Sequence, residues 1–112
     1  MQSSFAAAYA EMIDAVLKLG ICSSVCTIYD ANYPEPHGRL VVTALSLFND
    51  VITRAAFSHG LPLIDLRLIC HEPSDYANSI EPSSQGGDKI VSAIAAMVRG
   101  DATRRPPSSV WV

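Results

Sequence analysis

The chain has 112 residues, of which 49% are hydrophobic and 17% charged, so it belongs with folded chains and is short enough to form a single domain. Eight Lys and Arg against eleven Asp and Glu give a net charge of −3, which leaves no broad cationic surface for nucleic acid. No apolar run reaches the ~20 residues that span a bilayer, and Met1 to Leu19 lacks the basic start and compact apolar stretch of a signal peptide. We therefore expect a cytoplasmic protein with no nucleic-acid or membrane partner.

The first half of the chain predicts one helix followed by one strand. Apolar side chains recur at steps of three and four from Ser4 to Leu19, which is the pattern of an amphipathic helix, and Gly20 is expected to end it. The next segment, Ile21 to Tyr29, is rich in β-branched residues and is predicted to be a buried strand. It leads into a turn-forming stretch, Asp30 to Pro36.

The second half repeats this alternation. A helix is predicted from Arg39 to His59, and its apolar side chains cover both flanks, which indicates burial on two sides. Gly60 is expected to cap it, and Leu61 to Cys70 is predicted to form the second strand. A polar loop, His71 to Gln85, then leads to a last helix from Gly87 to Val98.

The order helix, strand, helix, strand, helix is typical of α/β proteins with a parallel sheet and right-handed crossovers. Two strands make a sheet too narrow to cover three helices. The sequence therefore predicts an α/β fold that is half of a three-layer, doubly wound parallel sheet, completed by dimerisation. Residues 1–99 would form its single domain, and residues 100–112 a flexible tail with Trp111 as its one anchor.

The run from Phe57 to Ile94, which contains HGLPLIDLR and SDYANSIEPSSQGGDKIVSAI, resembles the C-terminal half of an SGNH (GDSL-type) hydrolase. The segment CTIYDANYP fits the strand and loop before it. The resemblance implies a flavodoxin-like sheet, of which this chain would keep the fourth and fifth strands with their helices. It also implies a catalytic Ser, oxyanion donors Gly and Asn, and an Asp-x-x-His pair before the last helix, but the Ser, Gly and Asn blocks are missing from this sequence.

Four residues are candidates for a vestigial site of that kind. At the position of the Asp-x-x-His pair the chain has Asn78 and Glu81, so a carboxylate stands where the resemblance implies a basic imidazole. With an ordinary pKa of about 4.3, a glutamate is a poor base for a serine hydroxyl near neutral pH. Asp75 is a further polar group of the same loop, and His71 directly follows the predicted second strand.

Purely structural roles also explain these polar residues. Ser83 or Ser84 is suited to cap the last helix, and Glu81 then needs no partner beyond solvent or a nearby Arg. Asp65 and Arg67, which alternate with apolar neighbours, are expected to form a local ion pair.

The three cysteines are too few for a disulfide scaffold. Cys70, with His71 and Glu72 after it, has the donor types of a zinc site, as do Cys22 and Cys26. The last two would lie about 13 Å apart along a strand, too far to share one ion. We expect no metal and no cofactor.

Two classes of function remain open. In the first, the chain is a catalytically incomplete SGNH-like domain that acts as a self-associating structural or binding protein, a homodimer joined through the open edge of its first strand at Val25 to Tyr29. In the second, it is an esterase or acyl hydrolase for small esters, whose nucleophile is unrecognised or comes from a partner chain. His37 and His59 are the other imidazoles available as a base. A fluorophosphonate probe, which reacts with activated serines, separates the two classes.

Overall fold

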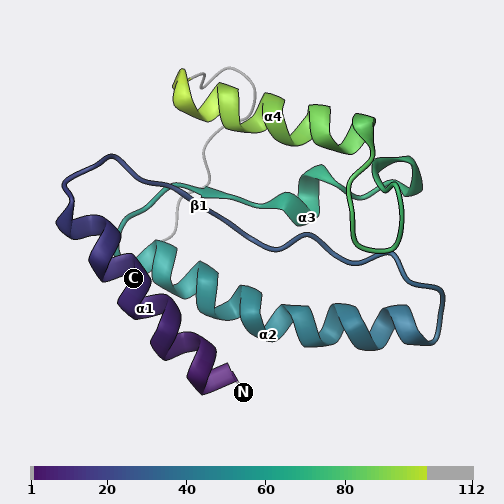
Figure 1. Ribbon diagram of the computed structural model, residues 1–112, viewed down its shortest axis with the longest axis horizontal. Coiled ribbons are helices and arrows are strands. Elements are labelled where there is room, and N and C mark those ends of the chain that lie inside the picture. The colour runs from purple at the N-terminus through teal and green to yellow at the C-terminus, as the bar shows by residue number, and fades with distance from the viewer. Residues whose placement is uncertain (1, 101–112) are drawn as a thin grey trace.

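The computed structural model describes residues 2–100, and most of them are helical (Figure 1). Two short extended segments pair in parallel, with Val25 opposite Leu63 and Cys26 opposite Ile64. The elements in chain order are α1 (Gln2–Lys18), β1 (Val25–Cys26), α2 (His37–Ser58), β2 (Leu63–Ile64), α3 (Leu66–Ile69), the 3-10 turn η1 (Pro73–Asp75) and α4 (Ser84–Val98).

The predicted fold class, half of a three-layer flavodoxin-like sheet, is wrong. Each strand has only two residues, and the segment predicted as one strand from Leu61 to Cys70 turns into α3 after Ile64. Asp65 causes the turn, because its carboxylate accepts a hydrogen bond from the Arg67 N–H (3.2 Å) and so caps the helix. The Thr27 hydroxyl accepts another from the Leu66 N–H (2.9 Å). These bonds stabilise a helical turn at the expense of a longer strand.

The three long helices are confirmed to within a few residues of their predicted ends. Gly20 and Gly60 have φ angles of 69° and 65°, the left-handed conformation predicted for the residues that end α1 and α2. Ser83 caps α4 by accepting a hydrogen bond from the Gly86 N–H (3.2 Å), so this helix begins earlier than predicted. The predicted tail lies, apart from Gly100, outside the described residues, as does Trp111.

The helices lie on opposite sides of the strand pair. α1 packs on α2 on one side, and α4 lies on the other (Figure 1). By length and composition α2 could span a membrane, yet here it packs against α1 and β1. Among residues 2–100 the buried apolar core is small and consists of Ile13, Ile52, Ala56, Ile64, Cys70 and Ala96.

Candidate functional site

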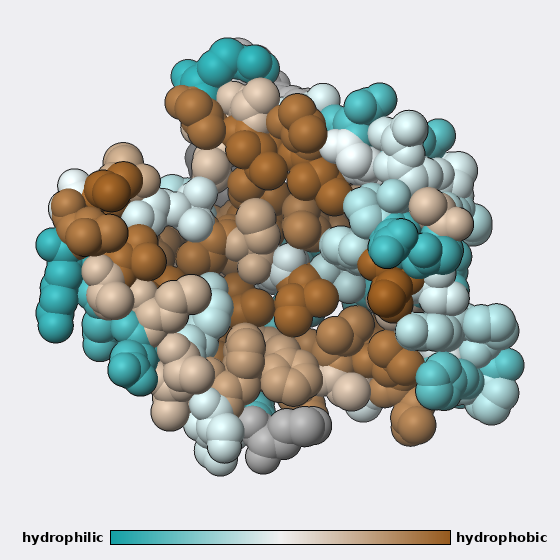
Figure 2. Space-filling view, viewed as in Figure 1, coloured by the Kyte–Doolittle hydropathy of each residue, from teal (hydrophilic) through white to brown (hydrophobic). Residues whose placement is uncertain are grey.

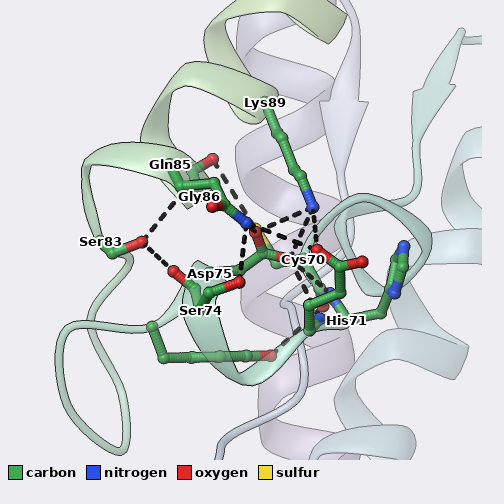
Figure 3. A network of polar contacts seen from close by, with 10 residues as sticks. Cys70, His71, Ser74, Asp75, Ser83, Gln85, Gly86 and Lys89 are labelled. Carbon is green, nitrogen blue, oxygen red and sulfur yellow. Dashed lines mark hydrogen bonds and ion pairs between the residues drawn. The ribbon is translucent and has the colours of Figure 1, made fainter.

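Asp75, one of the predicted site residues, is the centre of a buried polar network at the start of α4 (Figure 3). Its side chain is fully buried and accepts hydrogen bonds from the backbone N–H groups of His71 and Glu72, each 3.1 Å long. Gln85 Nε2 donates from 3.0 Å, and Lys89 Nζ lies 2.9 and 3.0 Å from the two carboxylate oxygens. The network ties the loop before η1 to the first turns of α4.

The charges in this network fix its protonation. The Lys89 ammonium and then the backbone and amide donors hold the pKa of the Asp75 carboxyl well below its usual range, although burial opposes this shift. Asp75 in turn raises the pKa of Lys89, and Glu72 adds to that effect from 3.1 Å. Both groups therefore stay charged near neutral pH, and Asp75 is a structural anion with no free lone pair for proton transfer.

Gly86 closes the same network from the helix side. A Cβ at this position would overlap the Asp75 carbonyl oxygen, which also accepts a hydrogen bond from the Ser83 N–H (2.8 Å). The neighbouring Gly87 has nothing within 4 Å of its Cβ position. Of the two adjacent glycines, only Gly86 is required by a close approach of two backbones.

Asn78 and Glu81 are brought together, as their three-residue spacing suggests. Asn78 Nδ2 donates to Glu81 Oε2 (2.9 Å), while Asn78 Oδ1 accepts from the backbone N–H groups of Ile80 and Glu81 at 3.0 and 2.9 Å. Both side chains are exposed. The carboxylate of Glu81 thus has an amide as its partner, and the pair stabilises a turn.

His71 does not join Asn78 and Glu81. Its backbone N–H is used by Asp75, and the residue itself is exposed. The four candidate residues therefore separate into a buried anchor, an exposed turn and a surface imidazole. In the part of the chain that the structure describes, no group of three or more His, Cys, Asp or Glu side chains could hold a metal ion.

An apolar cleft of about 330 Å³ lies next to the turn that Asn78 forms. Its wall includes Tyr29 and Tyr33 from the segment after β1, His37 and Val41 from the start of α2, and Ile80 from the turn. The rings of Tyr33 and His37 meet edge to face with their centroids 5.1 Å apart. The Tyr29 hydroxyl donates to the Ile80 carbonyl (2.5 Å) and so joins two of the residues that line the cleft. The volume is at the lower limit for small-molecule pockets.

Asn49 on α2 has a structural role that the sequence did not predict. Its side chain is 1% exposed; Oδ1 accepts from the Ile28 N–H (2.7 Å), and Nδ2 donates to the Ile28 carbonyl (2.9 Å). The amide thus pairs with both backbone groups of one residue, as a residue of a neighbouring antiparallel strand would. The available signal was a polar residue on the face of α2 that also carries Ile52 and Ala56.

The position of Asn49 shows which edge of β1 is open. The N–H groups of Val25 and Thr27 donate to Pro62 and Ile64 oxygens, both at 3.0 Å, so they face β2. Because successive peptide groups of a strand point to opposite sides, those of Cys26 and Ile28 face away from β2. Asn49 covers this outer edge at Ile28, while no hydrogen bond within residues 2–100 covers it at Cys26.

Exposed apolar side chains gather on the face of the molecule that carries β1. Figure 2 shows them gathered over α4, the extended segment of β1 and α2 on the face toward the viewer. On α4 they form a stripe of Val91, Ile94 and Val98, which are 65%, 39% and 75% exposed. Leu19 and Ile21, just before β1, are 69% and 61% exposed. A soluble monomer rarely leaves so many large apolar groups uncovered around a strand edge.

No family model, curated protein or solved structure matches this chain. The SGNH-type interpretation of the run from Phe57 to Ile94 accordingly stays a prediction.

Proposed function

We propose that the chain is a non-catalytic, self-associating interaction module whose binding surface is the apolar face around the open edge of β1. The observation that carries the proposal is the combination of an uncovered strand edge at Cys26 with exposed apolar side chains just before β1 and on α4. A second copy offers the same edge and the same apolar groups, so one symmetric contact covers both surfaces.

Burial of this face supplies a sizeable driving force. Covering a side chain as exposed as Leu19, Val91 or Val98 stabilises a complex by about 1–2 kcal/mol. Two copies contribute the same set, and together these gains offset a large part of the roughly 4–15 kcal/mol that association costs. The paired strands add hydrogen bonds at peptide groups that are otherwise left to water.

The geometry of the predicted site residues favours a role without catalysis. Asp75 is fully engaged with Lys89, Gln85 and two backbone donors, and the Glu81 carboxylate is held by Asn78. A serine hydrolase instead needs a base that is oriented by a third group and hydrogen-bonded to the nucleophile. The polar groups of this loop stabilise the start of α4 and the preceding turn.

Sedimentation velocity at low micromolar concentration tests self-association. We expect a species of twice the 12.0 kDa chain mass. The Ser24→Pro substitution removes a donor next to the open edge without touching the Val25 and Thr27 bonds to β2, and should shift the protein to monomer. Ser84→Pro, at the first position of α4 after its cap Ser83, is the control for a general effect of proline, because a helix tolerates proline there. A folded monomer at these concentrations contradicts the proposal.

A fluorophosphonate probe tests the absence of catalysis. We expect no labelling above that of the heat-unfolded chain. Stoichiometric labelling of the folded dimer that disappears on replacing one serine would show an esterase, and the second class of function would then stand.

A further inference from the structure

The stretch of backbone around β1 that can pair with another strand is limited at both ends. On the N-terminal side the chain turns at Gly20, whose φ of 69° ends α1. On the C-terminal side Asn49 occupies both the N–H and the carbonyl of Ile28. A strand from outside can therefore pair only with the residues between these two points, and Ser24 lies midway between them.

The central position of Ser24 favours one register for an antiparallel pair of two such edges. We infer that two copies join along the outer edges of their β1 segments about a two-fold axis at Ser24, an inference that rests on the proposed self-association. Cys22 then lies opposite the partner's Cys26, and Ser24 opposite the partner's Ser24. β1 itself covers only Val25 and Cys26, and the inferred pairing extends it back to Cys22. The alternation of peptide groups along this extended strand turns those of Cys22, Ser24 and Cys26 outward, which forms three hydrogen-bonded pairs with about six bonds in all.

Neighbouring registers form fewer bonds. An axis at Val25 pairs Ser24 with the partner's Cys26 and Cys26 with the partner's Ser24, for about four bonds, and places Cys22 opposite the partner's Ile28, which is bonded to Asn49. An axis at Cys26 places Ser24 opposite the partner's Ile28, whose peptide groups are already bonded to Asn49, so only the central pair keeps its about two bonds. With the axis at Ser24, Ile28 instead faces the partner's Gly20, where the partner's chain turns away. At each end of the interface, the Asn49 contact of one chain then lies opposite the Gly20 turn of the other chain.

The proposed register places thiols in a distinctive arrangement. Cys22 and Cys26 are both free and exposed, and their even spacing puts their side chains on one face of the strand. In the dimer Cys22 has the partner's Cys26 at a Cα distance of about 5.5 Å. Two copies of the same cysteine are about 13 Å apart, because four residues of strand separate them.

A short bis-maleimide that joins two thiols tests this register on the intact protein. Each maleimide adds one thiolate across its double bond, so no oxidant is needed. We expect the wild type to cross-link efficiently, while Cys22→Ser and Cys26→Ser alone each reduce the covalent dimer at least tenfold. Mixing these two single variants should restore cross-linking, because a mixed dimer again pairs Cys22 of one chain with Cys26 of the other.

The controls separate the register from the self-association itself. The double variant with both exposed cysteines replaced keeps only Cys70, which is 1% exposed, and measures background reaction. If Cys22→Ser still cross-links as wild type does while Cys26→Ser does not, the axis lies at Cys26 and the inferred register is wrong. A dimer in sedimentation whose single variants show no complementation on mixing overturns the register alone, and a monomer overturns the proposed function as well.

Discussion

The contact between Asn49 and Ile28 can be tested by its contribution to stability. Asn49→Ala removes two hydrogen bonds, of 2.7 and 2.9 Å, from a side chain that is 1% exposed. Each bond contributes about 1 kcal/mol, and leaving the Ile28 N–H and carbonyl without partners adds to the loss, so the free energy of unfolding should fall by about 2–4 kcal/mol. That is a large part of the roughly 5–15 kcal/mol that stabilises a typical domain.

Urea unfolding followed by circular dichroism measures this loss. The expected decrease corresponds to a midpoint lower by roughly 1–2 M urea. Asp50→Asn is the matched control, because the Asp50 side chain is 49% exposed and pairs with Arg54 along the same helix. It should change stability by less than about 0.5 kcal/mol. If Asn49→Ala is as stable as that control, the Asn49 amide does not hold the strand edge.

The pH dependence of Asn49→Asp provides a second readout of the same contact. The introduced carboxylate can still accept from the Ile28 N–H, but its other oxygen would face the Ile28 carbonyl. Burial and that carbonyl raise the folded-state pKa of the new group above its unfolded value of about 3.9. Relative to wild type, the variant should therefore be most stable at low pH, where the protonated acid donates to the carbonyl, and should lose stability as pH rises through the raised pKa.

Three further outcomes are expected. Gly86→Ala should destabilise the fold strongly in a thermal melt, because the new Cβ meets the Asp75 carbonyl, whereas Gly87→Ala, with open space at that position, should be tolerated. Because the pKa of Asp75 is lowered in the folded state, its contribution to the free energy of unfolding is complete above the ordinary pKa of 3.8 and is lost as pH falls toward the folded-state value. An Asp75→Asn variant should therefore be less stable near neutral pH and show a weaker acid dependence in urea unfolding. Burial raises the pKa of the Cys70 thiol, and a chromogenic disulfide should therefore titrate Cys70 only after unfolding, while Cys22 and Cys26, exposed in the single chain, should react before unfolding.

The helices could be predicted from the sequence because their signals are local. Apolar residues at spacings of three and four, followed by Gly20 and Gly60, predict α1 and α2 at the positions where the structure has them. The ion pair of Asp65 with Arg67 was also predicted, and its atoms lie 2.8 Å apart. The same pair ends the second strand early, however, because Asp65 also caps α3. A run of apolar residues shows where burial is expected but not how long the strand remains extended.

The candidate site could be predicted only where its contacts are close in sequence. Asn78 and Glu81 are three residues apart and do meet. Asp75 was a candidate for the same site, yet it is buried and paired with Lys89, 14 positions further along, because η1 packs on α4. The cleft itself joins Tyr33 and His37 to Ile80 across more than forty positions of chain. Such long-range contacts depend on the tertiary fold, and no periodic pattern encodes them.

The partial protection of β1 explains why self-association should be specific. Proteins usually blunt a strand edge with charges, proline or a covering segment, and here Asn49 does so at Ile28 alone. A fully open edge would allow several registers, each placing different apolar groups in contact. Blocking one end leaves Ser24 as the centre of the remaining edge, and the Gly20 turn limits the other end. Removing the Asn49 amide should therefore both destabilise the chain and broaden the cross-linking pattern, so that Cys26 also reacts with the partner's Cys26 in the Cys22→Ser background.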